Sequence, residues 1–473
     1  MSTSYDIVIL GGGTGGYIAA IRAAQLGMKT AIVERDRLGG TCLHRGCIPS
    51  KALLRSAEVY ATMKTSTQYG IAASGVTVDF PKVLERKNTI VEQLHKGVQF
   101  LMKKNAIDVY LGNGRITGPS IFSPKGGSIA VERADGEVDT LAPNHLVLAT
   151  GSRPRTIPGL EPDGQYILTS DEALDLSALP RSILIVGGGV IGVEWASMLS
   201  DFDVEVTIVE AAPRLVPLED EDISKELERL FKKRKLKVLT GAKVQADTLV
   251  KSESGVTVKV KYKGETIELA ADKMLVSIGR AANTEGFGLE NTGVKVERGV
   301  IQVNAYMQTS EPNTYAIGDV NGGLQLAHVA SHEGIIAVEH IAGRQPHPLK
   351  AHLVPRCIYT RPEIASVGWT EQEAIAQGRE IKTGKFSFKA IGKALVYGEN
   401  DGFVKVIADK NSNDLLGVHM IGPHVTDYIS EAALAQVLDA TPWEVGRTIH
   451  PHPTLSEALG EAMLAVDGNA LGM

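Results

Sequence analysis

The chain has 473 residues, of which 43% are hydrophobic and 22% charged, and its formal net charge is −6 at pH 7. This length predicts roughly two to four domains, because single hydrophobic cores rarely grow so large. The slightly acidic charge argues against a nucleic-acid-binding surface. The one basic run, residues 232–235, follows an amphipathic stretch and is interpreted as a solvated helix end.

The sequence also argues against a secreted or membrane protein. Near its start, the apolar residues 7–10 form a stretch too short for a signal peptide. No stretch approaches the roughly 18 apolar residues of a membrane span. Three cysteines are too few for the disulfide framework of a secreted domain. We therefore expect a cytoplasmic protein, in which a close cysteine pair indicates chemistry.

An internal repeat is the clearest organisational feature. Residues 6–34 and 182–210 share one layout: a short β-branched strand, a glycine loop, a helix, and a second strand that ends in glutamate. Such glycines permit a tight turn, the approach of a pyrophosphate and close packing of the helix, whose N-terminus attracts the phosphates. The alternative is a duplicated fold that binds nothing. The predicted glycines are Gly11, Gly13 and Gly16 in the first copy and Gly187, Gly189 and Gly192 in the second.

The glutamate that ends each repeat predicts which dinucleotides bind. Glu34 and Glu210 stand at the same distance from the first glycine of their copies. A glutamate there can bind ribose hydroxyls and would repel a 2′-phosphate, which favours NAD over NADP at Glu210. Arg214 lies nearby and leaves NADP as the alternative. Two such folds in one chain suggest FAD in one copy and NAD in the other.

Two further segments read as buried strands that end in polar residues. Residues 145–154 form a strand that breaks at Thr150, at a natural crossing between domains. Residues 314–320 form another strand, followed by Asp319. An aspartate just past the carboxyl end of a strand is placed to meet a ligand hydroxyl, although Asp319 could instead cap the next helix.

Cys42 and Cys47 form a close pair directly after the first repeat. Zinc would need more ligands, and only Cys357, far along the chain, remains. Flanking glycines and a proline give the backbone the freedom that a short-range disulfide requires. From the residues alone, the pair is a close and unmetallated one. Cys357 is interpreted as a packed core residue.

A histidine-rich segment offers a competing metal site. His328 and His332 stand four apart, with His340 and His347 beyond, and histidines at this spacing on a helix could share a metal. No carboxylate completes a recognisable motif. We therefore expect no metal; the family resemblance described below implies instead a helix whose N-terminus packs against the flavin.

Taken together, these motifs resemble the flavoprotein disulfide reductase family over the whole chain. The resemblance is carried by the two glycine loops and by residues 39–51, 145–154, 314–320 and 450–457. It implies an α/β fold with two Rossmann-like dinucleotide-binding domains plus a C-terminal α+β dimerisation domain. The expected boundaries are 1–150 for the first part of the FAD-binding domain, 151–280 for the NAD-binding domain, 281–348 for a central region completing the FAD domain, and 349–473 for the dimerisation (interface) domain.

The resemblance also implies unequal roles for the two cysteines, which would form a redox-active disulfide. Cys42 is then the thiol that exchanges with substrate, and Cys47 lies against the flavin. His452 would be the base that makes the substrate thiolate, with Glu457 orienting its ring. In the family this histidine–glutamate pair reaches the disulfide of the other subunit, which implies an obligate homodimer.

Further residues are implied at the cofactors. Lys51 would stabilise negative charge on the reduced flavin, with Glu194 as its ion-pair partner; the alternative for each is a solvated surface charge. The complete set of expected cofactor-binding residues is Gly11, Gly13, Gly16, Glu34, Gly40, Thr41, Lys51, Thr150, Gly151, Ser152, Gly187, Gly189, Gly192, Glu210, Gly279, Arg280, Gly318, Asp319, Ala327 and His328.

Within the family, residues 48–51 and Glu210 resemble the members that oxidise protein-bound dihydrolipoamide with NAD⁺ in 2-oxoacid dehydrogenase complexes. The implied partners are lipoyl domains and the core acyltransferase. His44 and Arg45 replace the commoner Asn-Val, which resembles the subgroup serving branched-chain complexes, and we expect them to alter the charge near the disulfide. The alternatives are another disulfide reductase, a redox-idle scaffold subunit, and a transhydrogenase or NADH oxidase.

Overall fold

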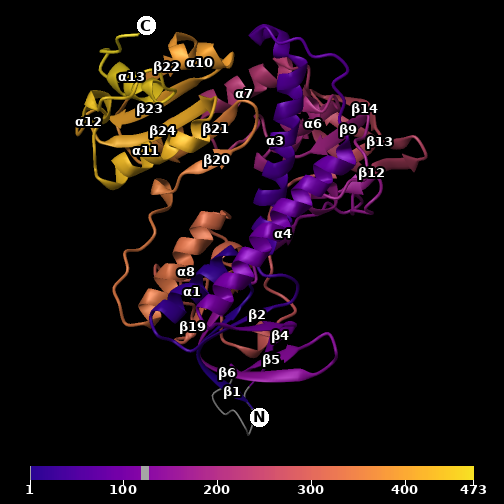
Figure 1. The fold of residues 1–473 in the computed structure, drawn as a ribbon, viewed down its shortest axis with the longest axis vertical. Helices are drawn as coiled ribbons and strands as arrows, with labels where there is room; N and C mark the ends of the chain where they lie inside the picture. Colours follow the sequence, from indigo (N-terminus) through magenta and orange to yellow (C-terminus); the bar gives the residue numbers. More distant parts are fainter. Residues whose placement is uncertain (1, 119–126, 473) are drawn as a thin grey trace. The chain divides into compact units, whose positions relative to one another are not determined.

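The computed structural model describes residues 2–118 and 127–472. The chain forms two compact units, each assembled from separate stretches. The first unit comprises Met1–Ala52, Lys82–Arg155 and Arg280–Leu349, and the second comprises Leu53–Pro81, Thr156–Gly279 and Lys350–Met473. The colours of the ribbon follow these stretches along the chain (Figure 1).

The first unit is built on a seven-stranded sheet of order β3-β2-β1-β6-β5-β4, with β19 pairing β6. Its central strands run parallel, so that Ile9 lies opposite both Ile32 and Val147. These strands are almost continuously apolar because a parallel sheet is covered on both faces. The strands are β1 (Thr3–Leu10), β2 (Thr30–Glu34), β3 (Asp108–Leu111), β4 (Asn113–Ile116), β5 (Ile129–Glu132), β6 (Val138–Leu148) and β19 (Thr314–Ala316).

Helix α1 packs closely on α8 because glycines line the contact (Figure 1). A Cβ at Gly15 would lie 3.0 Å from the carbonyl oxygen of Ala330, and one at Gly334 would lie 2.9 Å from that of Gly15. The helices that belong to this unit, wholly or in part, are α1 (Thr14–Gln25), α2 (Gly40–His44), α3 (Cys47–Lys64), α4 (Phe80–Lys104) and α8 (Ala327–Ile341). Its short elements are β7 (Ser152–Pro154), β16 (Arg280–Ala282), η2 (Leu289–Asn291), β17 (Val296–Glu297), β18 (Val300–Ile301) and η3 (Gly318–Asn321).

The second unit contains a parallel sheet of order β11-β10-β9-β15-β8, beside an antiparallel sheet of order β12-β13-β14. The parallel strands are β8 (Ile167–Leu168), β9 (Ser182–Val186), β10 (Glu205–Glu210), β11 (Lys237–Thr240) and β15 (Lys273–Val276). The antiparallel strands are β12 (Lys243–Ser252), β13 (Gly255–Tyr262) and β14 (Glu265–Ala271). The helices here are η1 (Ser66–Tyr69), α5 (Ser170–Ala173), α6 (Val190–Asp201) and α7 (Glu221–Lys233).

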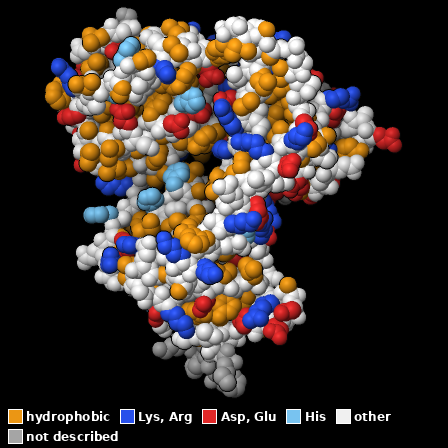
Figure 2. Space-filling model, in the orientation of Figure 1, with side chains coloured by type: hydrophobic (Ala, Val, Ile, Leu, Met, Phe, Trp, Pro, Cys, Tyr) orange, Lys and Arg blue, Asp and Glu red, His pale blue; other side chains and the backbone are white. Residues whose placement is uncertain are grey.

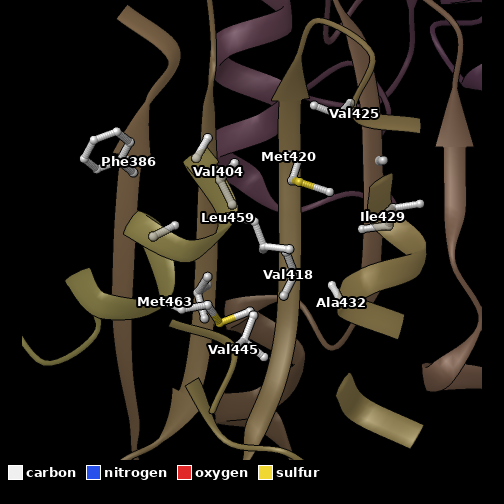
Figure 3. Close-up of a cluster of buried hydrophobic side chains, with 14 of the residues drawn as sticks. Phe386, Val404, Val418, Met420, Val425, Ile429, Ala432, Val445, Leu459 and Met463 are labelled. Atoms are coloured by element: carbon white, nitrogen blue, oxygen red, sulfur yellow. The ribbon is translucent and has the colours of Figure 1, made fainter. Parts of the chain in front are cut away.

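The same unit carries a C-terminal antiparallel sheet of order β20-β21-β24-β23-β22. Its buried core joins strand residues such as Met420 to Leu459 of α13 and Ile429 of α11 (Figure 3). The strands are β20 (Arg356–Ile358), β21 (Glu363–Gly368), β22 (Ile381–Ser387), β23 (Phe403–Asp409) and β24 (Leu415–Gly422). The helices are η4 (Ala351–Leu353), α9 (Glu371–Ala376), η5 (Phe388–Ala390), α10 (Gly392–Tyr397), α11 (Val425–Val437), α12 (Pro442–Arg447) and α13 (Glu457–Ala465).

The basic run at the end of α7 was interpreted as a solvated helix end, which is right for its lysines and wrong for Arg234. Lys232 and Lys233 are exposed and contact carboxylates. Arg234 does not fit: its side chain is only 17% exposed and lies 2.9 Å from Asp201. Since a buried guanidinium requires a partner, this residue has a packing role. On the face shown in Figure 2, positive and negative side chains are interspersed.

Both repeats form the predicted strand, glycine loop, helix and strand, as β1–α1–β2 and β9–α6–β10. The α/β fold class is therefore confirmed, with an antiparallel sheet near the C-terminus. The division into separate NAD-binding and dimerisation domains stays a prediction. Within the described residues, no helix has the length and apolar character that crossing a membrane requires.

Candidate active site and dinucleotide loops

The first glycine loop connects β1 to α1 and leaves no room for side chains. Gly11 has a φ of 115°, a conformation that disfavours residues with a Cβ. A Cβ at Gly16 would overlap the carbonyl oxygen of Gly11. The backbone N–H of Gly12 donates to Oε2 of Glu34 at 2.7 Å, and Asp36 N–H donates to Oε1 at 2.9 Å. This loop is a backbone cradle of the kind that fits a dinucleotide pyrophosphate.

The second glycine loop repeats this geometry between β9 and α6. Gly187 has a φ of 110°, and a Cβ at Gly192 would overlap its carbonyl oxygen. Glu210 accepts from the N–H groups of Gly188 at 2.5 Å and Ala212 at 2.6 Å. The same residue types at the same spacing have therefore produced a second cradle that fits a dinucleotide.

Arg214 was the reason for keeping NADP as an alternative, but its guanidinium is hydrogen bonded to residues 217–224. Its Nη1 donates to the carbonyl of Glu219 at 2.6 Å and to the hydroxyl of Ser224 at 2.8 Å. Its Nη2 donates to the carbonyl of Pro217 at 2.6 Å. These bonds hold the guanidinium at the start of α7, which weakens the argument for a 2′-phosphate.

A cavity of about 260 Å³ lies where β1 and β2 of the first unit end. It is lined by eight of the predicted cofactor residues, namely Gly11, Gly13, Glu34, Gly40, Thr41, Thr150, Gly151 and Ser152. Residues that sequence reasoning missed line it too, among them Asn113, Gly114, Asn283 and Phe287. Their signal was weak, because Asn113 and Gly114 on β4 and Asn283 and Phe287 on a loop belong to segments that carry no motif. The glycine cradle and this cavity together fit the phosphate-bearing part of FAD.

Three predicted residues from distant segments meet beside this cavity. Arg280 donates to the hydroxyl of Ser152 at 2.7 Å and to its carbonyl at 2.9 Å. The Ser152 hydroxyl in turn donates to the carboxylate of Asp319. Asp319 therefore does not cap the following helix, which begins after Leu326 without a side-chain cap. Nearby, Thr150 donates through its hydroxyl to the carbonyl of Asn283 at 2.7 Å.

A buried glutamate supports the turn that contains Asp319. Glu333 of α8 accepts from the N–H of Gly318 at 2.6 Å and from the side chain of Asn321 at 3.0 Å. Burial raises the pKa of Glu333 to about 7. Sequence reasoning missed this residue, although a glutamate on a buried helix face was a signal for it. Ala327 and His328 lie in the first turn of the same helix.

The two cysteines face each other across the break between α2 and α3. Cys42 belongs to α2 and Cys47 begins α3, and both side chains are partly buried. A hydrogen bond with Cys47, together with burial, raises the pKa of Cys42, whereas the Thr14 hydroxyl and the charge of Lys51 oppose this shift. The pair thus lies against the N-terminus of α1, the helix of the first cradle.

The C-terminal segment contains two histidine–carboxylate pairs where the sequence predicted one. His452 Nδ1 lies 2.9 Å from Glu457, and its side chain is 78% exposed. Although burial opposes it, hydrogen bonds from the Thr454 N–H and His452 lower the pKa of Glu457. Behind this pair, His450 lies 2.8 Å from Glu431, and this hydrogen bond raises the pKa of His450.

Lys51 and Glu194 belong to different units, so their ion pair stays a prediction. Glu194 is buried and accepts from the N–H of Tyr359 at 2.9 Å, so the alternative of a solvated surface charge is wrong for this residue. Cys357 is partly buried and packs against the core of the C-terminal sheet. Gly189 and Gly279 lie on loops of the second unit, and Gly279 has a φ of 99°.

The histidines of α8 are not arranged as a metal site. His332 Nδ1 lies 2.9 Å from the carbonyl oxygen of His328, a contact within the helix. Over residues 2–118 and 127–472, no group of three or more His, Cys, Asp or Glu side chains is placed to hold a metal ion.

Comparison with known proteins places these features in a family. The family model described as pyridine nucleotide-disulphide oxidoreductase matches residues 5–334, and the model of its dimerisation domain matches residues 354–463. The dihydrolipoyl dehydrogenase of Bacillus subtilis is 65% identical over 472 residues, covering 100% of both chains. That of Zymomonas mobilis is 43% identical, again over 100% of both.

Two solved structures share the fold over nearly the whole chain. LpdA from Mycobacterium tuberculosis matches with a TM-score of 0.89 and 29% identity, over 98% of this chain and 99% of that one. The HOCl-induced flavoprotein disulfide reductase RclA from Escherichia coli, solved as a Cu(II) complex, matches with a TM-score of 0.85 and 27% identity, over 98% and 99%.

Proposed function

Because the chain belongs to the pyridine nucleotide-disulphide oxidoreductase family, we propose that it acts as a dihydrolipoyl dehydrogenase. It oxidises protein-bound dihydrolipoamide to lipoamide and reduces NAD⁺. The observation that carries this proposal is the thiol pair of Cys42 and Cys47, hydrogen bonded to each other at the N-terminus of α1. A dithiol beside a dinucleotide cradle is the arrangement that two-electron exchange with a substrate dithiol requires.

The two cradles divide the cofactors between them. FAD is held by the first loop and its cavity, with Glu34 at the ribose, and NAD⁺ by the second loop, with Glu210 at the ribose. FAD, when bound, accepts two electrons from the thiols and delivers them as hydride to nicotinamide. Lys51 supplies positive charge close to Cys42, and the Ser152–Arg280–Asp319 group supplies polar contacts beside the cavity.

The exchange step transfers two electrons from the substrate dithiol to the protein disulfide, and all the bonds that break or form are bonds to sulfur. In the oxidised protein Cys42 and Cys47 form a disulfide, and a substrate thiolate attacks Sγ of Cys42. The bond between the cysteines breaks, and Cys47 leaves as a thiolate. The second substrate thiol then displaces Cys42 and closes the lipoamide ring. Of the two protons lost by the substrate, one goes to the base and one to Cys42.

His452 is the base in this scheme. A free thiol has a pKa of about 8.5, so little thiolate is present at neutral pH without a proton acceptor. The hydrogen bond from Nδ1 to Glu457 leaves Nε2 free to accept the substrate proton and stabilises the imidazolium that forms.

We place this base against the disulfide of a second copy of the chain. The dimerisation-domain match supports a homodimer. Apolar side chains near the base support it too: Leu434, Leu438 and Trp443 are exposed, and Ile449 is 94% exposed. Exposed apolar groups clustered in one region are typical of surfaces that another chain covers.

The physiological partners are lipoyl domains and the core acyltransferase of a 2-oxoacid dehydrogenase complex. His44 and Arg45 favour a branched-chain complex within this proposal. We place the chain in the cytoplasm, because three cysteines are too few for the disulfide framework of a secreted protein.

The test is a steady-state assay with free dihydrolipoamide and either NAD⁺ or NADP⁺. We expect turnover with NAD⁺ at least tenfold more efficient than with NADP⁺. Glutathione disulfide with NADPH is the matched assay for a different reductase, and turnover there in place of dihydrolipoamide would overturn the substrate assignment.

The disulfide itself is tested by counting thiols before and after reduction with NADH. Two additional thiols per subunit are expected, and none in Cys47→Ser. A transhydrogenase or NADH oxidase would show no such increase. If the chain were a redox-idle scaffold subunit, the Cys47→Ser variant would support the activity of the whole complex as well as the unaltered chain does.

A further inference from the structure

Two histidines from different helices converge on one carbonyl oxygen. His44 Nε2 lies 2.9 Å from the oxygen of Leu38, and His95 Nδ1 of α4 lies 2.9 Å from the same atom. Their rings pack edge to face with centroids 5.2 Å apart. A carbonyl oxygen has two lone pairs, so both ring nitrogens donate to it.

Leu38 is itself bound to the first glycine loop. Its side chain is buried, and a Cβ at Gly12 would lie 2.7 Å from its Cδ2 atom. The next residue, Gly39, donates its N–H to the carbonyl of Gly12 at 2.8 Å and forms a parallel bridge with Gly13. Any displacement of the Leu38 peptide therefore moves the backbone against which the cradle is built.

Asp36 and Arg37, which precede Leu38, are also held by ion pairs. Asp36 accepts from Arg45 at 2.6 Å, and Arg37 donates to Glu92 of α4 at 2.5 Å. We call residues 36–39 the bracing segment. It is tied to the end of α2 through Arg45, to α4 through Glu92, and to both through the two histidines.

The bracing segment separates two cavities. His44 and Arg45 line the 260 Å³ cavity that contains the predicted cofactor residues. His95 lines a second cavity of about 420 Å³, and Asp36 and Arg37 line both. This arrangement places His44 and Arg45 at the dinucleotide cavity, which suggests a role for them besides the expected change of charge near the thiols.

We infer that His44 and His95 are positioning residues that fix the first glycine loop, through the carbonyl of Leu38, for tight binding of the flavin dinucleotide. This inference rests on the proposed flavin site. Each imidazole contributes only an N–H, so the role requires a donor at that position. Burial lowers the pKa of His44, which favours the neutral ring with a single N–H.

The charged groups around the pair are balanced. Asp36 of the bracing segment pairs with Arg45, and Arg37 of the same segment pairs with Glu92 of α4. The positive and negative groups offset one another, so the loss of either N–H is the main change that a substitution would make.

The experiment measures the dissociation constant of FAD from the purified holoenzyme by recovery of flavin fluorescence. His44→Leu removes the donor and is expected to weaken FAD binding about tenfold, because a buried carbonyl loses one partner. His44→Asn keeps an amide N–H and is expected to remain within about threefold of the unaltered chain. His347→Leu, at an exposed position, makes the same chemical change without effect.

A double-mutant cycle with His95→Leu tests whether the two histidines act together. We expect their effects on the FAD dissociation constant to be non-additive, since both act through one oxygen. Unchanged FAD binding in His44→Leu, or equal loss in His44→Leu and His44→Asn, would overturn the inference. Failure of the proposed function itself would show as dihydrolipoamide turnover absent from the flavin-loaded, unaltered chain.

Discussion

The two glycine loops have the same skeleton but different surroundings. In both, the residue after the first glycine, Gly12 or Gly188, donates its N–H to the glutamate that ends the repeat, and the last glycine of the motif packs on the carbonyl of the first. The counterparts Gly13 and Gly189 are similarly open, since a Cβ would meet Gly40 Cα at 3.9 Å in the first loop and nothing within 4 Å in the second. The loops differ at the next position but one, where Gly15 meets Ala330 of α8 and the second loop has Ile191.

This difference matches the two kinds of ligand that the proposed function requires. A flavin stays bound through many turnovers, and the first loop is accordingly covered by α8, which meets Gly15. A nicotinamide cofactor must enter and leave in each cycle; the second loop shares the packing of a leucine on the residue after its first glycine, because Leu215 contacts Gly188 and Val216 donates to the Gly188 carbonyl at 2.9 Å. Under the proposed function, the duplicated skeleton binds a pyrophosphate in both loops, and the close contact with α8 distinguishes the flavin loop.

The largest expected effect comes from breaking each loop separately. Gly16→Ala and Gly192→Ala both place a methyl group into a backbone carbonyl. We expect Gly16→Ala to abolish flavin binding, measured by the absorbance of the purified protein. Gly192→Ala should retain flavin and lose reduction of that flavin by NADH. Loss of flavin from both variants alike would contradict the division of roles.

A second effect concerns Glu333, the buried carboxyl of α8 that accepts hydrogen bonds from Gly318 and Asn321. Its raised pKa of about 7 means that the folded protein holds a proton that the unfolded chain releases near pH 4.5. This stabilisation is present at low pH and is lost as pH rises from about 4.5 to 7, by up to about 3 kcal/mol. Relative to Glu333→Gln, the melting temperature of the unaltered chain should therefore fall over this interval. Parallel profiles would contradict the shift.

A smaller effect is expected where α8 covers the first loop. Gly15→Ala places a Cβ 3.0 Å from the carbonyl oxygen of Ala330 and should cost about 1–3 kcal/mol of unfolding free energy. Gly97→Ala in α4 is the control, since its Cβ would meet nothing within 4 Å, and it should stabilise by up to about 1 kcal/mol. Equal denaturation midpoints for the two variants would show that the close contact with α8 carries no energy.

The smallest effect concerns the choice between nicotinamides. Glu210→Gln keeps an oxygen for the Gly188 N–H but removes the negative charge. We expect the preference for NAD⁺ over NADP⁺, measured as the ratio of kcat/KM values, to fall about tenfold. Glu34→Gln should leave this ratio unchanged, because Glu34 belongs to the loop that we propose binds flavin. A change of the same size in Glu34→Gln would contradict the assignment of the two loops.

Much of this comparison could be predicted from local sequence. The glycine spacing and the terminal glutamates predicted both cradles, because each cradle is completed within one continuous repeat. The second function of Glu34 and Glu210, accepting backbone N–H groups of the loop and of the residue two positions on, was missed. A carboxylate suited to a ribose also suits a backbone donor, and the sequence does not distinguish the two partners.

The residues that were missed meet across long stretches of chain. His44 and His95 approach each other only because α2 and α4 pack at one segment, and His450 finds Glu431 on another helix. The spacing of residues along the sequence does not predict such contacts between side chains on different elements. For the same reason Ser152, Arg280 and Asp319 were each predicted as cofactor residues, while the hydrogen bonds that join them were not.

The interrupted layout of the first unit has a consequence for its synthesis on the ribosome. Strand β19 (Thr314–Ala316) pairs with β6, which ends at Leu148, so the first sheet is completed only after the whole parallel sheet of the second unit, which spans residues 167–276, has emerged. At about 5–20 residues per second, the first sheet waits roughly 10–30 seconds for its last strand. Under the proposed function, the sheet that carries the flavin loop is therefore completed after the sheet that carries the nicotinamide loop.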